Sequence, residues 1–135
     1  MAIRLGCEPE LTVEEFRAVL VASTLGERRP VDEPERLARM LREADLVVTA
    51  REGERLVGVS RALTDFSYCC YLSDLAVDAA YQRRGIGRML VAETHRLAGV
   101  ADTTLILTAA PAAEGYYPKI GMQAVTSAWM VRRRR

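Results

Sequence analysis

The chain of 135 residues carries 19 basic and 18 acidic side chains, so its formal net charge is only +1. This length fits one ordinary domain, and we expect residues 1–135 to form a single domain. A charge this small provides no overall basic field for nucleic acid, and no segment reaches the ~20 apolar residues that cross a membrane. We therefore expect neither nucleic acid nor a membrane as a partner.

The three cysteines do not favour disulfides or a metal site. Cys69 and Cys70 are adjacent, and adjacent side chains of a strand point to opposite faces. No C-x-x-C spacing indicates zinc, and we expect no metal. Reduced thiols, together with an N-terminus that lacks the apolar run of a signal peptide, predict a cytoplasmic location.

The N-terminal third predicts a short strand and two helices. The strand is expected at residues 3–5. Thr12 followed by Glu15 is a capping box, which predicts that a helix begins there, and Gly26 is expected to end it. A second helix is expected over residues 32–44, with apolar side chains at helical spacing.

The middle of the chain predicts strands followed by a long helix. Residues 46–51 and 55–63 are expected to form an antiparallel hairpin. Residues 68–77 are almost wholly apolar, which predicts a strand buried on both faces near the middle of a sheet. Residues 82–97 carry a helical apolar stripe, and Gly99 is expected to cap that helix.

Three further elements are expected: a strand at residues 103–108, a short helix at 112–120 and a last strand at 122–132. The two strands that flank the long helix should run parallel, with a right-handed crossover. The element order β-α-α-β-β-β-α-β-α-β predicts an α/β fold with a central mixed sheet flanked by about four helices.

The sharpest chemical signal lies at residues 82–87, where a buried strand leads through a short turn into a helix start. Free amides and the dipole of a helix start form an anion site. Gly85 and Gly87 allow a diphosphate to approach the backbone without meeting a Cβ. Three arginines add positive charge there: Arg83, Arg84 and Arg88.

Two other nucleotide motifs do not fit this segment. A P-loop requires Gly-Lys-Ser/Thr after its glycines, which the chain lacks. A dinucleotide fingerprint requires a third glycine where Leu90 stands. The remaining structural alternative is a glycine-rich helix start packed against a neighbour, with solvated arginines.

The wider pattern resembles the GCN5-related N-acetyltransferase (GNAT) superfamily. The signature of that family, Gln/Arg-x-x-Gly-x-Gly/Ala between a strand and a helix, is matched at every fixed position by residues 82–87. The family also places a tyrosine shortly before a Gly-Phe pair, and here Tyr117 precedes Gly-Met at 121–122. The resemblance is strongest over residues 68–122 and weak over the first 45.

The resemblance implies an acyl-CoA-dependent N-acetyltransferase that moves an acetyl group from acetyl-CoA to a primary amine of a small molecule or peptide, by direct attack in a ternary complex. It also implies the residues that bind the cofactor. Leu75, Ala76 and Val77 would offer main-chain groups to the pantetheine arm, and one of their amides would stabilise the oxyanion. The pyrophosphate would lie on Gln82, Arg83, Arg84, Gly85, Ile86, Gly87 and Arg88.

Two further features follow from the same resemblance. Family members often form homodimers, and the expected last strand is a candidate contact. Many members carry Asn seven residues before the tyrosine, where this chain has Ala110, so one side-chain contact to CoA is lost or replaced.

The catalytic groups are expected to be Tyr117 and Asp74. Tyr117 matches the general acid of the family, and a phenol with a pKa near ~10 keeps its proton at neutral pH; the alternative is that it only packs against the cofactor. Asp74 is a candidate base or a structural carboxylate. Asp65 and Tyr68 are weaker candidates, and His95 fits a surface or packing role better.

Other functions stay open at this point. The same fold can serve as a non-catalytic acyl-CoA-binding or sensing module. The run at residues 132–135 consists of four arginines, which are usually solvated or contact a dimer partner, although a nucleic-acid contact would be salt-dependent. The acceptor is unassigned; the charge of Arg28, Arg29 and Arg61 alone favours an acidic one.

Overall fold

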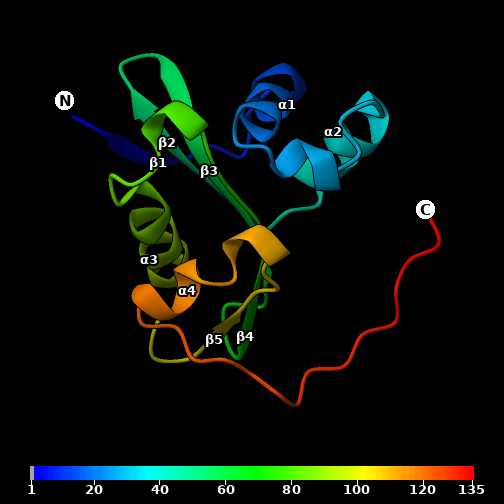
Figure 1. Cartoon of the computed structure of the whole chain (residues 1–135), viewed down its shortest axis with the longest axis vertical. Helices are drawn as coiled ribbons and strands as arrows, with labels where there is room; N and C mark the ends of the chain where they lie inside the picture. The colour runs from blue at the N-terminus through cyan, green and yellow to red at the C-terminus, as the bar shows by residue number, and fades with distance from the viewer. Residues whose placement is uncertain (1) are drawn as a thin grey trace.

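The computed structural model describes residues 2–135 and contains a five-stranded mixed sheet between two groups of helices (Figure 1). The strands are β1 (Arg4–Cys7), β2 (Leu46–Glu52), β3 (Arg55–Thr64), β4 (Cys69–Val77) and β5 (Thr104–Ile106). The helices are α1 (Val13–Ala22), α2 (Pro34–Arg42), α3 (Ile86–Ala98) and α4 (Tyr116–Lys119). Three 3₁₀ turns connect them: η1 (Leu25–Arg28), η2 (Ala79–Tyr81) and η3 (Pro111–Ala113).

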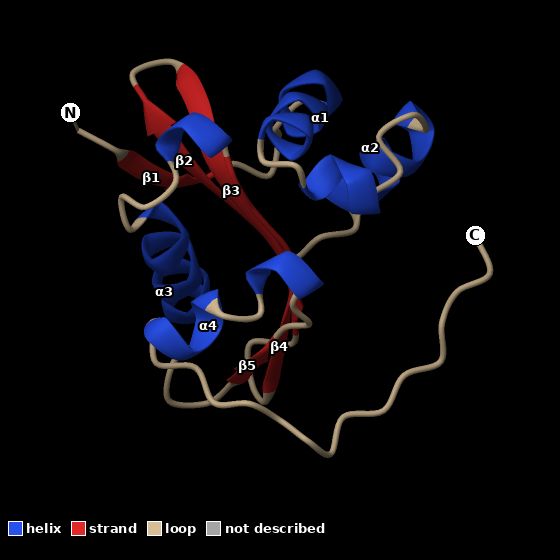
Figure 2. Cartoon of the chain, in the orientation of Figure 1, coloured by secondary structure: helices blue, strands red, loops and turns tan. Residues whose placement is uncertain are grey.

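The strands lie in the order β1-β2-β3-β4-β5 (Figure 2). The first four strands pair with their neighbours in antiparallel fashion. Strand β4 pairs with β5 in parallel, and α3 connects these two strands in the chain. This arrangement confirms the predicted α/β class, the hairpin and the mixed sheet.

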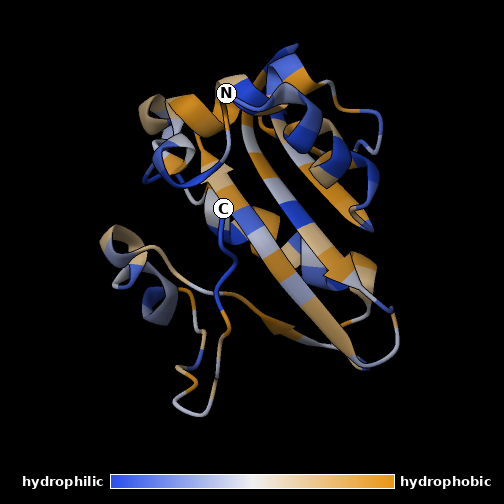
Figure 3. Ribbon diagram, turned by 90° about the vertical axis from the view of Figure 1, so that its right-hand side faces the viewer, coloured by the Kyte–Doolittle hydropathy of each residue, from blue (hydrophilic) through white to orange (hydrophobic). Residues whose placement is uncertain are grey.

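The two faces of the sheet carry separate cores. On one face, α3 packs Ile86 and Leu90 against Val48 and Val57. On the other face, α1 and α2 pack against a group that includes Val59. The strands are accordingly banded in hydropathy along their length (Figure 3). Burial of apolar side chains on both faces is what fixes the sheet between its helices.

The start of α1 confirms the capping box. The amide of Glu15 donates to the Thr12 hydroxyl oxygen at 3.1 Å. The expected end at Gly26 is wrong, because the helix stops at the C-cap Ser23. The Ser23 hydroxyl accepts the amide of Leu25 at 3.1 Å, which turns the chain directly into η1. The second helix is likewise shorter than expected, at Pro34–Arg42.

Strand β4 is not buried on both faces as expected. Its register with β3 shifts between Arg61 and Ala62, which pair with Asp74 and Leu72 respectively. This bulge reverses the direction of the side chains that follow, so Asp74 and Ala76 are buried beneath α1 and α2. No helix covers that face at the other end of β4, where Tyr71 stays exposed (Figure 1).

Helix α3 begins at Ile86 and not at Gln82 as expected. Residues 82–85 form a turn in which Arg83 (φ 67°) and Gly85 (φ 79°) are left-handed. The predicted C-cap is confirmed, since Gly99 ends the helix with φ 112° and its amide donates to the carbonyl oxygen of His95 at 2.9 Å.

The expected last strand at residues 122–132 is wrong: within residues 2–135, no strand follows α4. The segment runs away from the sheet toward α2 (Figure 1), and Trp129 is 94% exposed. Its end is held by Arg135, which donates to a Glu33 carboxylate oxygen at 2.8 Å. An alternation of apolar residues forms a strand only along a partner strand, and β5 offers only three paired residues. Among the described helices, none has both the length and the apolar character needed to cross a membrane.

Candidate active site

A groove of about 890 Å³ opens beside the end of β4. Its walls come from four segments, within residues 23–28, 75–77, 81–87 and 110–119. These segments are far apart in the sequence and are joined by the sheet and by the crossover through α3. The groove therefore connects the first turn of α3 with α4.

Most of the residues expected to bind the donor line this groove: Leu75, Ala76, Val77, Gln82, Arg83, Gly85, Ile86 and Gly87. The other two, Arg84 and Arg88, are not among its lining residues. The Arg84 guanidinium stacks over the ring of Tyr81 at 4.9 Å from the centroid. Arg88 is exposed in the first turn of α3.

The turn into α3 forms a cradle of backbone amides. The left-handed residues Arg83 and Gly85 curl the chain just before Ile86, and the amides of the first helical turn have no carbonyl partner within the helix. A Cβ placed on Gly85 would meet nothing within 4 Å. The Gln82 side chain donates to the carbonyl oxygen of Val77 at 3.1 Å and ties the turn to β4. Such a concave set of amides binds anions.

Close packing at the first turn of α3 requires the second glycine. A Cβ on Gly87 would lie 2.6 Å from the hydroxyl oxygen of Tyr116, which comes from α4. The Tyr116 and Tyr117 rings meet edge to face, with centroids 5.3 Å apart. Helix α4 is thereby held over the start of α3.

Strand β4 presents an open edge to the groove. Strand β5 pairs only with residues Cys69–Tyr71, so the part of β4 from Leu75 to Val77 extends beyond the end of its parallel neighbour. Leu75 and Val77 are half-buried, and Ala76 is buried on the other face. Main-chain groups along this edge are available to a ligand.

Tyr117 lies across the groove from β4. Its ring is half-buried, and burial together with the neighbouring Tyr116 raises the pKa of its phenol. Burial likewise raises the pKa of Tyr116, despite an opposing effect of Arg88. Both phenols therefore carry their protons at neutral pH, and Tyr117 fits a proton donor.

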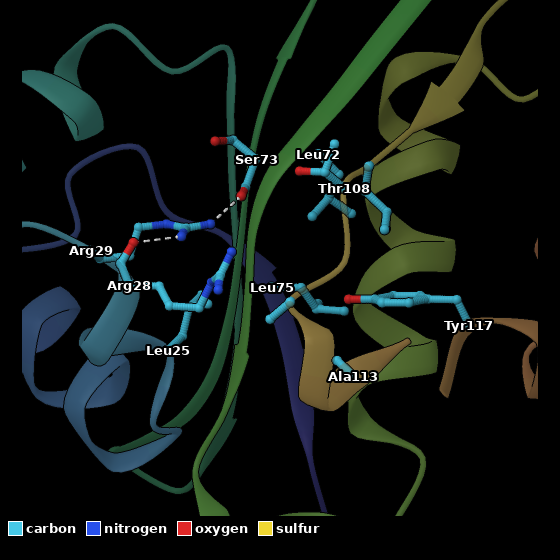
Figure 4. Close-up of a pocket in the computed structure, with 11 residues that line it drawn as sticks. Leu25, Arg28, Arg29, Leu72, Ser73, Leu75, Thr108, Ala113 and Tyr117 are labelled. Atoms are coloured by element: carbon cyan, nitrogen blue, oxygen red, sulfur yellow. Dashed lines mark hydrogen bonds between the residues drawn. The ribbon is translucent and has the colours of Figure 1, made fainter. Parts of the chain in front are cut away.

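A smaller pocket of about 90 Å³ adjoins the groove. The two hollows share several lining residues, among them Arg28, Leu75 and Tyr117. Figure 4 shows the Arg28 side chain extending from η1 toward β4, with Leu75 and Tyr117 on the far side. The small pocket thus lies between two arginines of the N-terminal region and the candidate proton donor.

Asp74 lies behind this pocket and does not line either hollow. It is fully buried, and its two carboxylate oxygens accept hydrogen bonds from Arg29 and Arg61. Arg29 also donates to the carbonyl oxygen of Ser73 at 2.8 Å, and Arg61 donates to the Ser73 hydroxyl at 3.0 Å. The carboxylate joins β3, β4 and the end of η1.

The comparison with protein families decides what kind of domain this is. A family profile described as an acetyltransferase (GNAT) domain matches residues 18–132, which is most of the chain.

The chain belongs to the GNAT acetyltransferase family.

Solved structures share the GNAT fold over nearly the whole chain. A GNAT-family acetyltransferase from Streptococcus pneumoniae is 21% identical, with a TM-score of 0.76, over 98% of this chain and 100% of that one. A probable acetyltransferase from methicillin-resistant Staphylococcus aureus is 20% identical, with a TM-score of 0.78, over 98% and 99%. An aminoglycoside N-acetyltransferase solved with CoA is 17% identical, with a TM-score of 0.71, over 99% and 95%. A comparison with curated proteins found no match.

Neither of the two weaker candidate bases of this GNAT domain, Asp65 and Tyr68, lines the groove or the small pocket. The Asp65 carboxylate accepts the amides of Ser67, Tyr68 and Cys69 at 2.9, 2.8 and 3.1 Å, and these bonds lower its pKa to about 2. It therefore closes the turn between β3 and β4, and it is a poor proton acceptor. Tyr68 is 79% exposed in that turn.

The lone histidine fits the packing role. A ring nitrogen of His95 lies 2.8 Å from the carbonyl oxygen of Thr103, where α3 approaches the start of β5. It lines neither hollow. Within residues 2–135, no cluster of three His, Cys, Asp or Glu side chains has metal-site geometry.

Sequence reasoning missed how η1 contributes to the site. The sequence indicated the charge of Arg28 and Arg29. It did not indicate that η1 folds over β4 and places these two residues opposite Tyr117. Leu25, from the same turn, lines both hollows. No local signal carries this information, because these residues lie forty or more positions before β4 in the chain and are brought to it by tertiary packing.

Proposed function

We propose that the chain transfers an acetyl group from acetyl-CoA to a primary amine of a small molecule or peptide, by direct attack in a ternary complex. The observation that carries the proposal is one groove that joins the amide cradle at the start of α3, the open edge of β4 and the half-buried phenol of Tyr117. Each part has a task in such a transfer.

The cradle suits the diphosphate of the donor. The first-turn amides of α3 and the backbone at Arg83 and Gly85 would hold its oxygens. Gly85 leaves open space at this turn where a side chain would otherwise stand. The main chain from Leu75 to Val77 would hold the pantetheine arm along the open edge of β4.

Acetyl-CoA, when bound, supplies the activated acyl group as a thioester. The protein then needs to orient an amine, stabilise an oxyanion and protonate a thiolate. We assign the oxyanion to a main-chain amide of Leu75–Val77. We assign proton donation to Tyr117, whose raised pKa keeps the phenol protonated.

The attacking amine must be neutral, and the small pocket offers no dedicated base. Among the described residues that line it, none is Asp, Glu or His. We therefore propose that the amine loses its proton to water. Asp74, buried between Arg29 and Arg61, would act as a positioning residue that fixes the pocket wall.

Two assays test the proposal. Acetyl-CoA at millimolar concentration should raise the melting temperature, because a ligand that binds only the folded state stabilises it. Release of free thiol should then depend on an added amine. Binding without thiol release from any amine would indicate the non-catalytic acyl-CoA-binding module, and the lack of any thermal shift would overturn both readings. Arg39→Gln, an exposed arginine of α2 outside both hollows, is the matched control.

We also propose a cytoplasmic location and a homodimer. The free cysteines support the location, and the resemblance to the family supports the homodimer. Size-exclusion chromatography with light scattering tests the second directly.

A further inference from the structure

We propose that the acceptor carries a carboxylate and that Arg28 binds it. The inference rests on the proposed function, since it names the acceptor class of the same site. It is carried by the contrast between Arg28 and the two arginines beside it.

Arg29 and Arg61 already have an acidic partner. Both donate to the buried carboxylate of Asp74. Within residues 2–135, no carboxylate forms an ion pair with Arg28, and its guanidinium makes no hydrogen bond. Arg28 is therefore a cation at the wall of a pocket, with its donors available to a ligand.

The backbone of Arg28 is nevertheless well held. Arg29 donates to the carbonyl oxygen of Arg28 at 2.9 Å, and the same guanidinium bonds Asp74 and the carbonyl oxygen of Ser73. This set of bonds fastens the end of η1 to β4. Arg29, which is bound to Asp74, thus holds the backbone of Arg28, whose own guanidinium has no acidic partner. This is the arrangement of a preorganised anion site.

The local charge favours an anionic acceptor. Of the three guanidinium groups here, those of Arg29 and Arg61 pair with the Asp74 carboxylate, and that of Arg28 has no acidic partner within residues 2–135. No acidic side chain of the described chain lines the small pocket, and Glu27 is the one acidic residue that lines the groove. An acceptor with several ammonium groups would meet this positive charge, whereas a carboxylate would pair with the planar fork of Arg28.

Arg28 lines the same small pocket as the residues proposed to carry the chemistry. That pocket of about 90 Å³ is also lined by Leu75 and Tyr117, and it adjoins the groove proposed to hold the donor. An amine directed toward Tyr117 and a carboxylate at Arg28 then belong to one short molecule. Amino acids have this pairing of groups.

The test compares acceptors that differ only in the carboxylate. Each of a set of α-amino acids is assayed beside its carboxamide, with acetyl-CoA and a free-thiol readout. We expect kcat/KM to be at least about tenfold higher for the carboxylates, from one charge-assisted pair. In Arg28→Gln, kcat/KM for the carboxylates should fall about 10- to 100-fold, while kcat/KM for the carboxamides and the KM for acetyl-CoA stay unchanged. Arg28→Lys should retain part of the preference, and Arg39→Gln should behave as the native chain.

Each other outcome has a definite meaning. Equal loss with carboxylates and carboxamides, or an increased KM for acetyl-CoA, would show that Arg28 serves the donor or the fold, and would overturn the inference while acetyl transfer stands. If no acceptor leads to thiol release from acetyl-CoA, the proposal of acetyl transfer is wrong. Calorimetric titration of amino acids into the CoA-loaded protein then tests whether Arg28 binds a carboxylate. Binding that Arg28→Gln abolishes supports the site without catalysis, and lack of binding to the native chain overturns it.

Discussion

A Cβ on Gly87 would lie 2.6 Å from the hydroxyl oxygen of Tyr116, so α4 packs directly over the first turn of α3. This contact joins the proposed diphosphate cradle to the helix that carries the proposed proton donor. The two halves of the site are therefore mechanically linked through one glycine.

Substitution of that glycine separates packing from phosphate binding. We expect Gly87→Ala to reduce the thermal shift by acetyl-CoA, with an affinity loss of about tenfold, because the added methyl group would collide with the Tyr116 hydroxyl and push α4 away from the amides proposed to hold the diphosphate. The double variant Gly87→Ala/Tyr116→Phe removes that hydroxyl and should recover part of the shift. An equal loss in the single and double variants would show instead that the methyl group itself obstructs the diphosphate.

Removal of the Tyr117 hydroxyl should affect turnover and spare donor binding. We expect Tyr117→Phe to lower kcat about 100-fold, the usual contribution of general acid catalysis, with an unchanged acetyl-CoA thermal shift. Tyr116→Phe is the matched control and should keep kcat within a few-fold. If Tyr117→Phe instead keeps the native kcat, Tyr117 is a packing residue and not the proton donor.

The pH profile should reflect the raised pKa of Tyr117. The protonated phenol is the active form, so its contribution is present below its pKa and lost as pH rises through it. Burial raises that pKa above the ordinary value of about 10. Turnover of the native chain, measured up to pH 9.5, should therefore show no decline caused by deprotonation of Tyr117. Such a decline would be present in the native chain and absent from Tyr117→Phe.

Asp74→Asn distinguishes a positioning residue from a base. Because the carboxylate is fully buried and partners Arg29 and Arg61, its loss leaves two arginines without their counter-charge. We expect the free energy of unfolding to fall by roughly 3–5 kcal/mol, measured by urea denaturation. An unchanged unfolding midpoint with lost kcat would instead identify Asp74 as the base.

Asp65 should stabilise the turn between β3 and β4 in a pH-dependent manner. Its pKa is lowered to about 2 by three backbone amides, so its contribution is full above the unfolded value near 3.8 and is lost as pH falls through about 2. The melting temperature of Asp65→Ala should lie below the native one at pH 7, and the difference should shrink below pH 3.8. A constant difference would mean that the charge of the carboxylate is irrelevant to the turn.

Trp129, the one tryptophan of the chain, reports the state of the C-terminal segment. At 94% exposure its emission should match that of a solvated indole, and unfolding should not shift it. Blue-shifted emission that depends on protein concentration would show instead that residues 122–131 are covered by a second copy.

Deletion of residues 132–135 should leave the acetyl-CoA thermal shift unchanged.

Local patterns were sufficient for several elements. The capping box at Thr12 located the start of α1, and Gly99 located the end of α3, because each depends on hydrogen bonds or dihedral angles within a few residues. The motif at residues 82–87 and Tyr117 indicated the family, and the motif predicted the proposed donor site from a strand, turn and helix start that are contiguous in the chain.

Other features depended on distant partners, and the sequence alone did not reveal them. A strand requires a neighbouring edge, so the apolar alternation at residues 122–132 predicted a strand that the structure lacks. The bulge in β4 arises from pairing with β3, and it buries Asp74 on the face of α1 and α2. The carboxylate that looked like a base is held by Arg29 and Arg61, and Arg28 reaches the pocket only because η1 folds over β4. The sequence by itself thus indicated the family and the turn at residues 82–87 that we propose to hold the donor, because that turn depends on short-range contacts. Tertiary packing decided which charges are paired and which face the small pocket, because ion pairs form between segments that only the folded sheet brings together.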